Sequence, residues 1–121
     1  MGISFHAPAD TFSLYADIPR IRRAIIEHFE MIICKAIQLR ARHLTMHLQS
    51  YPSFKNATDD FDQFERDYGS YYSQVLRENL AFLAGKTKGK LYLCVENFQW
   101  TDIGMQVLEN LFSDGIPVYL T

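Results

Sequence analysis

The sequence is poor in several residue types whose abundance would define a class of protein. Its 121 residues include only two cysteines, one tryptophan, four prolines and six glycines. Two cysteines exclude the disulfide framework typical of small secreted domains. We expect Cys34 and Cys94 to be reduced thiols in the core. A single disulfide between them is the alternative if their elements touch.

Long apolar runs and a strong excess of one charge are also missing. No uncharged apolar run approaches the roughly 18 residues of a membrane span. The start of the chain lacks the charged and apolar segments of a secretory signal. We therefore expect a cytoplasmic protein with no membrane partner. A formal net charge of −2 excludes the basic footprint typical of nucleic-acid binders.

Recognisable catalytic and cofactor motifs are absent as well. The chain contains no Gly-rich phosphate-binding loop and no nucleophile elbow. His43 and His47 are four residues apart and would share one face of a helix, where His6 or His28 could complete a metal site. No Glu follows His43, as a metallopeptidase would require. We interpret this pair as surface or interface histidines, and we expect no metal, no cofactor and no catalytic residue.

What the chain does contain is the composition of one globular domain. Hydrophobic residues make up 48% of the sequence and charged residues 21%, as in ordinary soluble proteins. A chain of 121 residues can bury a real core but is too short for two ordinary domains. We therefore predict a single domain over residues 1–121.

The best-defined stretch is the last third of the chain, which predicts strand, helix and strand. The unbroken apolar run 91–95 is typical of a strand buried on both faces. Asp102 suits the start of the following helix, and Gly115 suits the left-handed residue after it. Residues 116–120 then form a second strand, and Pro117 favours an edge position. So short a connection predicts a parallel crossover.

The preceding residues predict mainly helix. Residues 3–7 fit a short strand. Pro19 suits the first position of a helix, and no Gly or Pro then interrupts two adjacent apolar seams up to Leu48. This pattern predicts one long helix over 19–48 that bends, breaks or reaches a partner. Residues 58–85 predict a further helix that Gly69 divides in two and Gly85 caps. The predicted class is α/β (or α+β): a small three-stranded, partly parallel sheet covered by a helical layer, in the order β-α-α-(α)-β-α-β.

Two short stretches resemble motifs of known enzymes. Arg23 and His28 have the Arg-x4-His spacing of HEPN-like ribonucleases, and Arg40 with His47 gives a looser match. This resemblance implies an RNA-cleaving enzyme in which the Arg and His side chains of the long helix act on the scissile phosphate. Such an enzyme is the main alternative to the function given below.

The second stretch is LYLCVENFQWTD, residues 91–102. It is similar to the second acidic motif of large signalling ATPases, with Glu96 at the position that helps to hold magnesium and Gln99, Trp100 and Asp102 in the turn. Because the phosphate-binding loop is missing, we do not expect an ATPase. Glu96 and Trp100 still follow a predicted strand, at the end where parallel sheets usually bind ligands.

The element order resembles that of barstar-like inhibitors. The likeness rests on Asp67-Tyr68-Gly69 before a helix and on a later strand that closes on Glu-x-x-x-Trp. It implies a protein-binding role. We predict a small inhibitor, such as an immunity protein or antitoxin, that masks a partner's active site. An oligomerisation or structural subunit, in which the long helix forms a homodimer, is a further alternative.

An acidic and aromatic helical face is the predicted contact surface. Residues 51–85 carry six acidic side chains against three basic ones. Tyr and Phe supply contact area, and carboxylates steer toward a basic partner such as a nuclease or toxin. The predicted partner-binding residues are Asp59, Asp60, Asp62, Glu65, Tyr68, Tyr71, Tyr72, Glu96 and Trp100.

Overall fold

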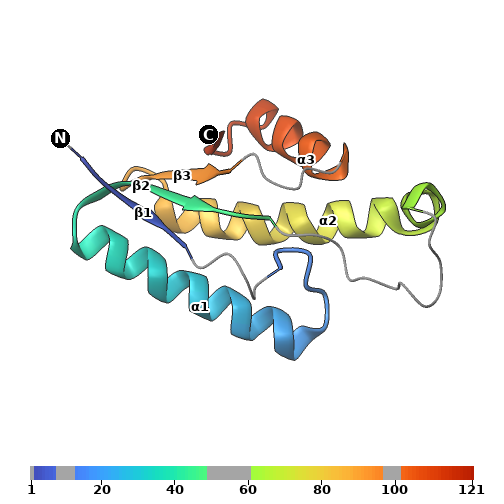
Figure 1. The fold of residues 1–121 in the computed structure, drawn as a ribbon, viewed down its shortest axis with the longest axis horizontal. Helices are drawn as coiled ribbons and strands as arrows, with labels where there is room; N and C mark the ends of the chain where they lie inside the picture. The colour runs from blue at the N-terminus through green and yellow to red at the C-terminus, as the bar shows by residue number, and fades with distance from the viewer. Residues whose placement is uncertain (1, 8–12, 49–60, 97–101) are drawn as a thin grey trace.

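The chain folds as alternating strands and helices (Figure 1). The computed structural model describes residues 2–7, 13–48, 61–96 and 102–121. Its elements are β1 (Ile3–His6), α1 (Pro19–Gln38), β2 (Ala41–Met46), α2 (Phe61–Thr87), β3 (Tyr92–Val95), α3 (Asp102–Ser113) and β4 (Val118–Leu120). The predicted α/β class is confirmed.

The strands form one fully parallel sheet in the order β1-β2-β3-β4. Each strand therefore lies beside the one before it, and one helix joins each pair. Parallel crossovers share one hand, so successive crossovers in one direction place their helices on the same face of the sheet. The predicted three-stranded sheet is wrong by one strand, because β2 lies inside the stretch that the sequence assigned to a long helix.

The long helix predicted for 19–48 ends at Gln38. Arg40 takes a left-handed conformation with φ 57°, and its N–H donates to the Ile37 carbonyl at 3.0 Å. This turn starts β2 at Ala41. Once extended, β2 pairs with β1 and β3 and buries Leu44 and Met46 in the core. Pairing on both sides thus overrides the helical spacing of its residues.

Helix α2 is one continuous helix over Phe61–Thr87, so the predicted division at Gly69 is wrong. The predicted cap at Gly85 is also wrong, since the helix passes through it. A mid-helix glycine costs about 1 kcal/mol relative to alanine. The burial of Leu76, Leu80 and Leu83 on the same helix offsets that cost. The predicted helix start at 58–60 lies outside the described residues.

The C-terminal unit folds as predicted in its main features. Helix α3 runs from Asp102 to Ser113, and Gly115 adopts φ 74° after it. The Ile116 N–H donates to the Leu111 carbonyl at 2.9 Å, which satisfies the end of the helix. Strand β4 follows Pro117 and is an edge strand, as expected.

The described helices cover one face of the sheet, and none of them covers the other. On the covered face, strand side chains pack against the helices in a continuous core that includes Phe29, Ile33, Leu44, Met46, Leu76, Leu80, Leu93, Val95, Leu111 and Val118. The other face, called the open face below, carries Ser4, His6, His43, Thr45, His47, Tyr92, Cys94, Glu96 and Tyr119, as strand register and alternation require.

The prediction that residues 91–95 are buried on both sides is confirmed except at Tyr92, since Cys94 on the open face is buried as well. Leu93 and Val95 are fully buried, whereas Tyr92 is 50% exposed. Of the two cysteines, Cys94 is buried as predicted, whereas Cys34 is exposed on α1, contrary to its predicted core position. Both are free thiols. None of the helices, in the part of the chain that the structure describes, has the length and hydropathy to cross a membrane.

Candidate functional site: a His-His-Glu cluster and an aromatic, basic open face

Three polar side chains meet where three parallel strands end. His6 is the last residue of β1, and His47 and Glu96 directly follow β2 and β3. The strands run in the same direction (Figure 1), so their carboxyl ends share one edge of the sheet. This is the edge at which open parallel sheets usually bind ligands.

The two histidines point at the same carboxylate oxygen. His6 Nε2 lies 2.9 Å from Glu96 Oε2, and His47 Nε2 contacts that same oxygen. The two imidazole rings meet edge to face, with centroids 4.9 Å apart. The three possible ligand atoms all lie within 4.8 Å of one another. Convergence of this kind needs β2 between β1 and β3, so it depends on the strand that the sequence did not predict.

Hydrogen bonds fix the orientation and charge of the cluster. His6 Nδ1 lies 2.8 Å from the Ala7 carbonyl oxygen, so Nδ1 carries a proton and donates it. The hydrogen bond to Glu96 raises the pKa of His6 above its usual 6.5. Hydrogen bonds from His6 and then from His47 lower the pKa of Glu96 below its usual 4.5. The cluster thus combines a carboxylate with an imidazole that holds its proton more firmly than a free one.

The cluster is accessible on one side and packed on the other. The side chains of His6 and Glu96 are 49% and 44% exposed, whereas that of His47 is 11% exposed. A buried ring held by packing, next to two solvent-facing groups, can coordinate a cation or exchange a proton with a bound molecule.

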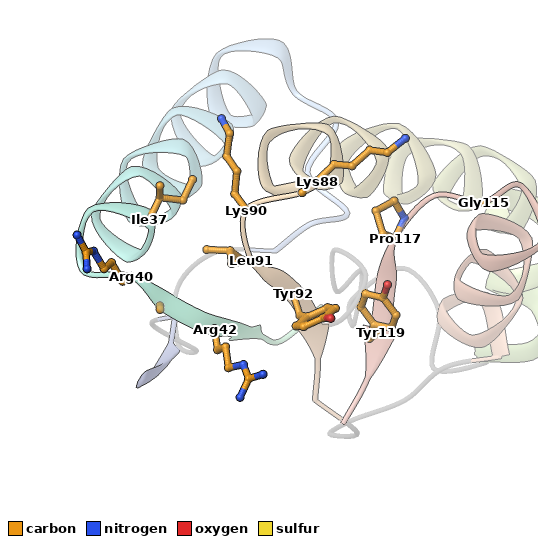
Figure 2. Close-up of a pocket in the computed structure, with 12 residues that line it drawn as sticks. Ile37, Arg40, Arg42, Lys88, Lys90, Leu91, Tyr92, Gly115, Pro117 and Tyr119 are labelled. Atoms are coloured by element: carbon orange, nitrogen blue, oxygen red, sulfur yellow. The ribbon is translucent and has the colours of Figure 1, made fainter. Parts of the chain in front are cut away.

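Further along the open face, three rings pack in a row. His43 stacks on Tyr92 with centroids 5.4 Å apart, and Tyr92 meets Tyr119 edge to face at 5.3 Å. Figure 2 shows Tyr92 and Tyr119 side by side on β3 and β4. Tyr92 and Tyr119 remain 50% and 39% exposed. The row is therefore a contiguous aromatic surface that solvent reaches.

A hollow of about 800 Å³ lies at the opposite, amino-terminal ends of the strands (Figure 2). Arg40, Arg42, Lys88 and Lys90 line it together with Tyr92 and Tyr119. None of these four basic side chains forms an ion pair with another described residue. Arg40, Lys88 and Lys90 follow the carboxyl ends of α1 and α2, where the helix dipole favours cations. The four basic side chains make the hollow positively charged.

The predicted partner-binding residues fall into separate parts of the molecule. Tyr68 and Tyr71 are exposed on α2, and the Tyr71 hydroxyl donates to Asp17 at 2.9 Å. Tyr72 is 5% exposed and belongs to the core, so it offers no contact surface. Glu96 lies in the cluster, away from that helical face. Asp59, Asp60 and Trp100, and the side chains of Asp62 and Glu65, lie outside the described residues.

The residues of the ribonuclease resemblance do not converge. Arg23 and His28 are both on α1, and five residues of helix separate their directions by roughly 140° around the axis. Arg40 precedes β2 and His47 follows it, which places them about 20 Å apart along an extended chain. His47 instead meets His6 and Glu96.

The His43 and His47 pair lies on a strand rather than on a helix. The two residues share a face in either case, because four is a near-multiple of both periods. Along a strand they stand about 13 Å apart, so they cannot bind one ion. His6 is one of the possible third ligands predicted from the sequence, but no sequence pattern indicates that His6 lies next to His47 and Glu96.

Comparison with models of known families, with curated proteins and with solved structures finds no match to this chain.

Proposed function

We propose that the chain is a protein-binding module that docks an acidic segment of a partner protein on its open face. We further propose that the module is a small inhibitor, of the immunity-protein or antitoxin kind, that covers the partner's active site. The single observation that carries the proposal is the exposed aromatic row on a parallel sheet face that no described helix covers.

Parallel sheets occur almost only with both faces covered. Here the second face presents Tyr92 and Tyr119 to solvent next to His43. Tyrosine is enriched among the residues that carry most of the energy of protein interfaces, since its ring buries much area and loses little rotamer freedom. A partner that seats on this row would supply the missing cover.

The charges beside the row favour an acidic partner. Arg42, Lys88 and Lys90 lie at one end of it and carry no ion pair within the described chain. A partner carboxylate would therefore meet unpaired cations there, which accelerates association and fixes the register of docking. The basic partner expected from the sequence belongs instead to the helical face of Tyr68 and Tyr71, and that face stays a prediction.

A protein suits this face better than a nucleic acid does. The whole chain has a formal net charge of −2 and an isoelectric point near 6.0, whereas nucleic-acid-binding domains are usually strongly basic.

Affinity capture with paired variants tests the proposal. The bait is the full chain, and the extract of its source cells is treated with nuclease. The open-face variant replaces Tyr92 and Tyr119 with Ser. The matched control makes the same replacement by Ser at Tyr68 and Tyr71, which are exposed tyrosines on α2. We expect one stoichiometric partner that the wild type and the control retain and the open-face variant loses.

Charge reversal tests the acidic character of the partner. Lys88→Glu with Lys90→Glu should weaken binding and flatten its salt dependence, whereas Arg23→Glu on the distant start of α1 should not. If the partner is an enzyme, titrating it with the module should abolish its activity at equal concentrations.

Three outcomes count against the proposal. Loss of the partner only in the Tyr68 and Tyr71 control would assign binding to the helical face. Retention of the partner by every variant would exclude both surfaces. Binding of a labelled RNA oligonucleotide that requires Tyr92 and Tyr119 would replace the protein partner with a nucleic acid.

A further inference from the structure

We propose that His6, His47 and Glu96 bind one divalent first-row transition-metal ion at the carboxyl-terminal edge of the sheet. This inference goes beyond the protein-binding function and does not rest on it. Its ligand atoms are His6 Nε2, His47 Nε2 and a carboxylate oxygen of Glu96, which already lie within 4.8 Å of one another.

The donor set selects the class of metal. Two imidazole nitrogens and one carboxylate suit zinc, iron(II), cobalt(II) and similar ions, whereas calcium and magnesium prefer sites built from oxygen alone. No described cysteine belongs to the cluster, so a closed structural zinc site of the thiolate type does not fit. The chain thus offers the three-ligand arrangement found in open, exchangeable metal sites.

A hydrogen bond on the far side of the ring orients one of the ligands. His6 donates its Nδ1–H to the Ala7 carbonyl at 2.8 Å, which leaves Nε2 as the nitrogen that faces the cluster. Metal-binding histidines almost always anchor the other ring nitrogen in this way, to a carbonyl or a carboxylate. The strand end therefore already holds His6 in a ligating orientation.

Only small movements are needed to close the ligands around an ion. Bonds of about 2.0–2.2 Å place neighbouring ligand atoms roughly 3 Å apart. His6 Nε2 and Glu96 Oε2 are already 2.9 Å apart. The exposed side chains of His6 and Glu96 can turn toward the ion, while the packed His47 ring stays in place.

Metal binding exchanges protons for the ion. In the metal-free protein, an N–H of an imidazole bridges to the Glu96 carboxylate. On binding, each protonated Nε2 releases its proton to solvent, and its lone pair forms the bond to the metal. No bond is oxidised or reduced, so the step needs no further reactant. Coordination positions not filled by these ligands face solvent beside His6 and Glu96.

Titration with zinc and cobalt chloride tests the site in the full chain. Zinc affinity is measured by competition with a chromophoric chelator, and cobalt(II) reports its ligands through visible absorption. The test variants are His6→Ala and Glu96→Gln, both at exposed side chains whose change should leave the fold intact. The matched control is His43→Ala, which removes a histidine from the open face but not from the cluster.

We expect the wild type and His43→Ala to bind one equivalent of zinc and to melt at a higher temperature with zinc than with chelator. Each test variant should bind zinc roughly 100-fold more weakly or worse, since losing even a residue that only orients a ligand lowers metal affinity by about 10–100-fold. Nitrogen-15 NMR of the histidine rings should show zinc at the Nε2 atoms of His6 and His47.

The inference fails if the wild type binds neither ion above the level of the two test variants. It also fails if His43→Ala lowers the affinity as much as His6→Ala does, or if NMR places the metal on Nδ1 of His6. Circular dichroism of each variant confirms that it is folded. Zinc is titrated without any partner protein, so failure to bind zinc does not bear on the docking proposal. Failure to capture a partner likewise does not bear on zinc binding.

Discussion

The two faces of the sheet differ in almost every property, although the same strands supply both. On the covered face, Leu44, Met46, Leu93 and Val95 are fully buried against the helices. One residue along each strand, the open face carries histidine, tyrosine, threonine and glutamate. Because alternate side chains point to opposite sides, core residues and residues proposed to bind a partner alternate along one short segment.

This separation leaves the open face free to vary in chemistry. The covered face must keep its shape, since a core packed at crystal density tolerates little change in volume. Apart from the buried Cys94, the open face contributes little to the core, so substitutions at its exposed residues should act on binding and leave the fold in place. An exposed open-face residue on which folding depends would contradict this division between the faces.

The largest effect should come from the core side of β2. Leu44 is fully buried, and we expect Leu44→Ala to lower the free energy of unfolding by about 2–5 kcal/mol. Its neighbour Thr45 lies on the open face, and Thr45→Ala should cost about 0.5 kcal/mol or less, as most surface changes do. Urea denaturation of both variants measures the two values. Equal losses would contradict the division between faces.

A polar group on the helical side should come next. Asn79 is 2% exposed, donates to the Leu14 carbonyl at 2.8 Å and accepts from Arg22 at 2.7 Å. Asn79→Ala leaves that carbonyl without its partner, and we expect a loss of about 1–3 kcal/mol in urea denaturation. The exposed Gln74 on the same helix is the control, and Gln74→Ala should have a much smaller effect. A negligible loss at Asn79 would show that water replaces its contacts.

The aromatic row should matter less to the fold than to binding. Tyr92 meets Tyr119 edge to face, and such pairs contribute about 0.5–1.5 kcal/mol. We therefore expect Tyr92→Ser to change the free energy of unfolding by about that amount. The same substitution should weaken partner binding by about 2 kcal/mol or more, if Tyr92 anchors the interface. If Tyr92→Ser does not fold, the open face is needed for the stability of the domain.

The smallest effect should be a pH dependence on the helical side. Hydrogen bonds from Gln74 and then Arg22 lower the pKa of Glu78 below its usual 4.5. Its contribution is therefore fully present above the unfolded pKa and is lost as the pH falls through the folded pKa. Glu78→Gln should therefore be less stable than the wild type at about pH 6, and the two proteins should become more nearly equal in stability at about pH 3. Because Glu78 is exposed, we expect a small change, and a difference that widens with acid would reverse the sign.

Much of the fold could be read from sequence, and the part that could not has a definite physical cause. The run 91–95, Gly115 and Pro117 mark the ends of the last elements clearly, and those elements are confirmed. The turn between α1 and β2 carries no such mark, because Arg40 takes the left-handed conformation that glycine usually supplies. Without a break in the pattern, the apolar residues of β2 continued the helical seam.

The candidate site was only partly predictable for the same reason. Glu96 was identified because it directly follows a strongly predicted strand. His47 becomes meaningful only when β2 is a strand, and His6 only when β1 lies beside it in register. Local patterns cannot show that three segments far apart in sequence end at one edge. The acidic helical face could be found from composition alone, but composition did not reveal that Tyr72 is buried.

The sequential strand order has a consequence for how the molecule is made. Each strand pairs with the strand that was synthesised just before it, so no strand has to be inserted between two that have already paired. Contacts of this kind close short loops first and reduce the entropy that must be lost before favourable contacts form. A chain built in this way can add one strand and one helix at a time as it leaves the ribosome, and Glu96 completes the cluster only when β3 has joined.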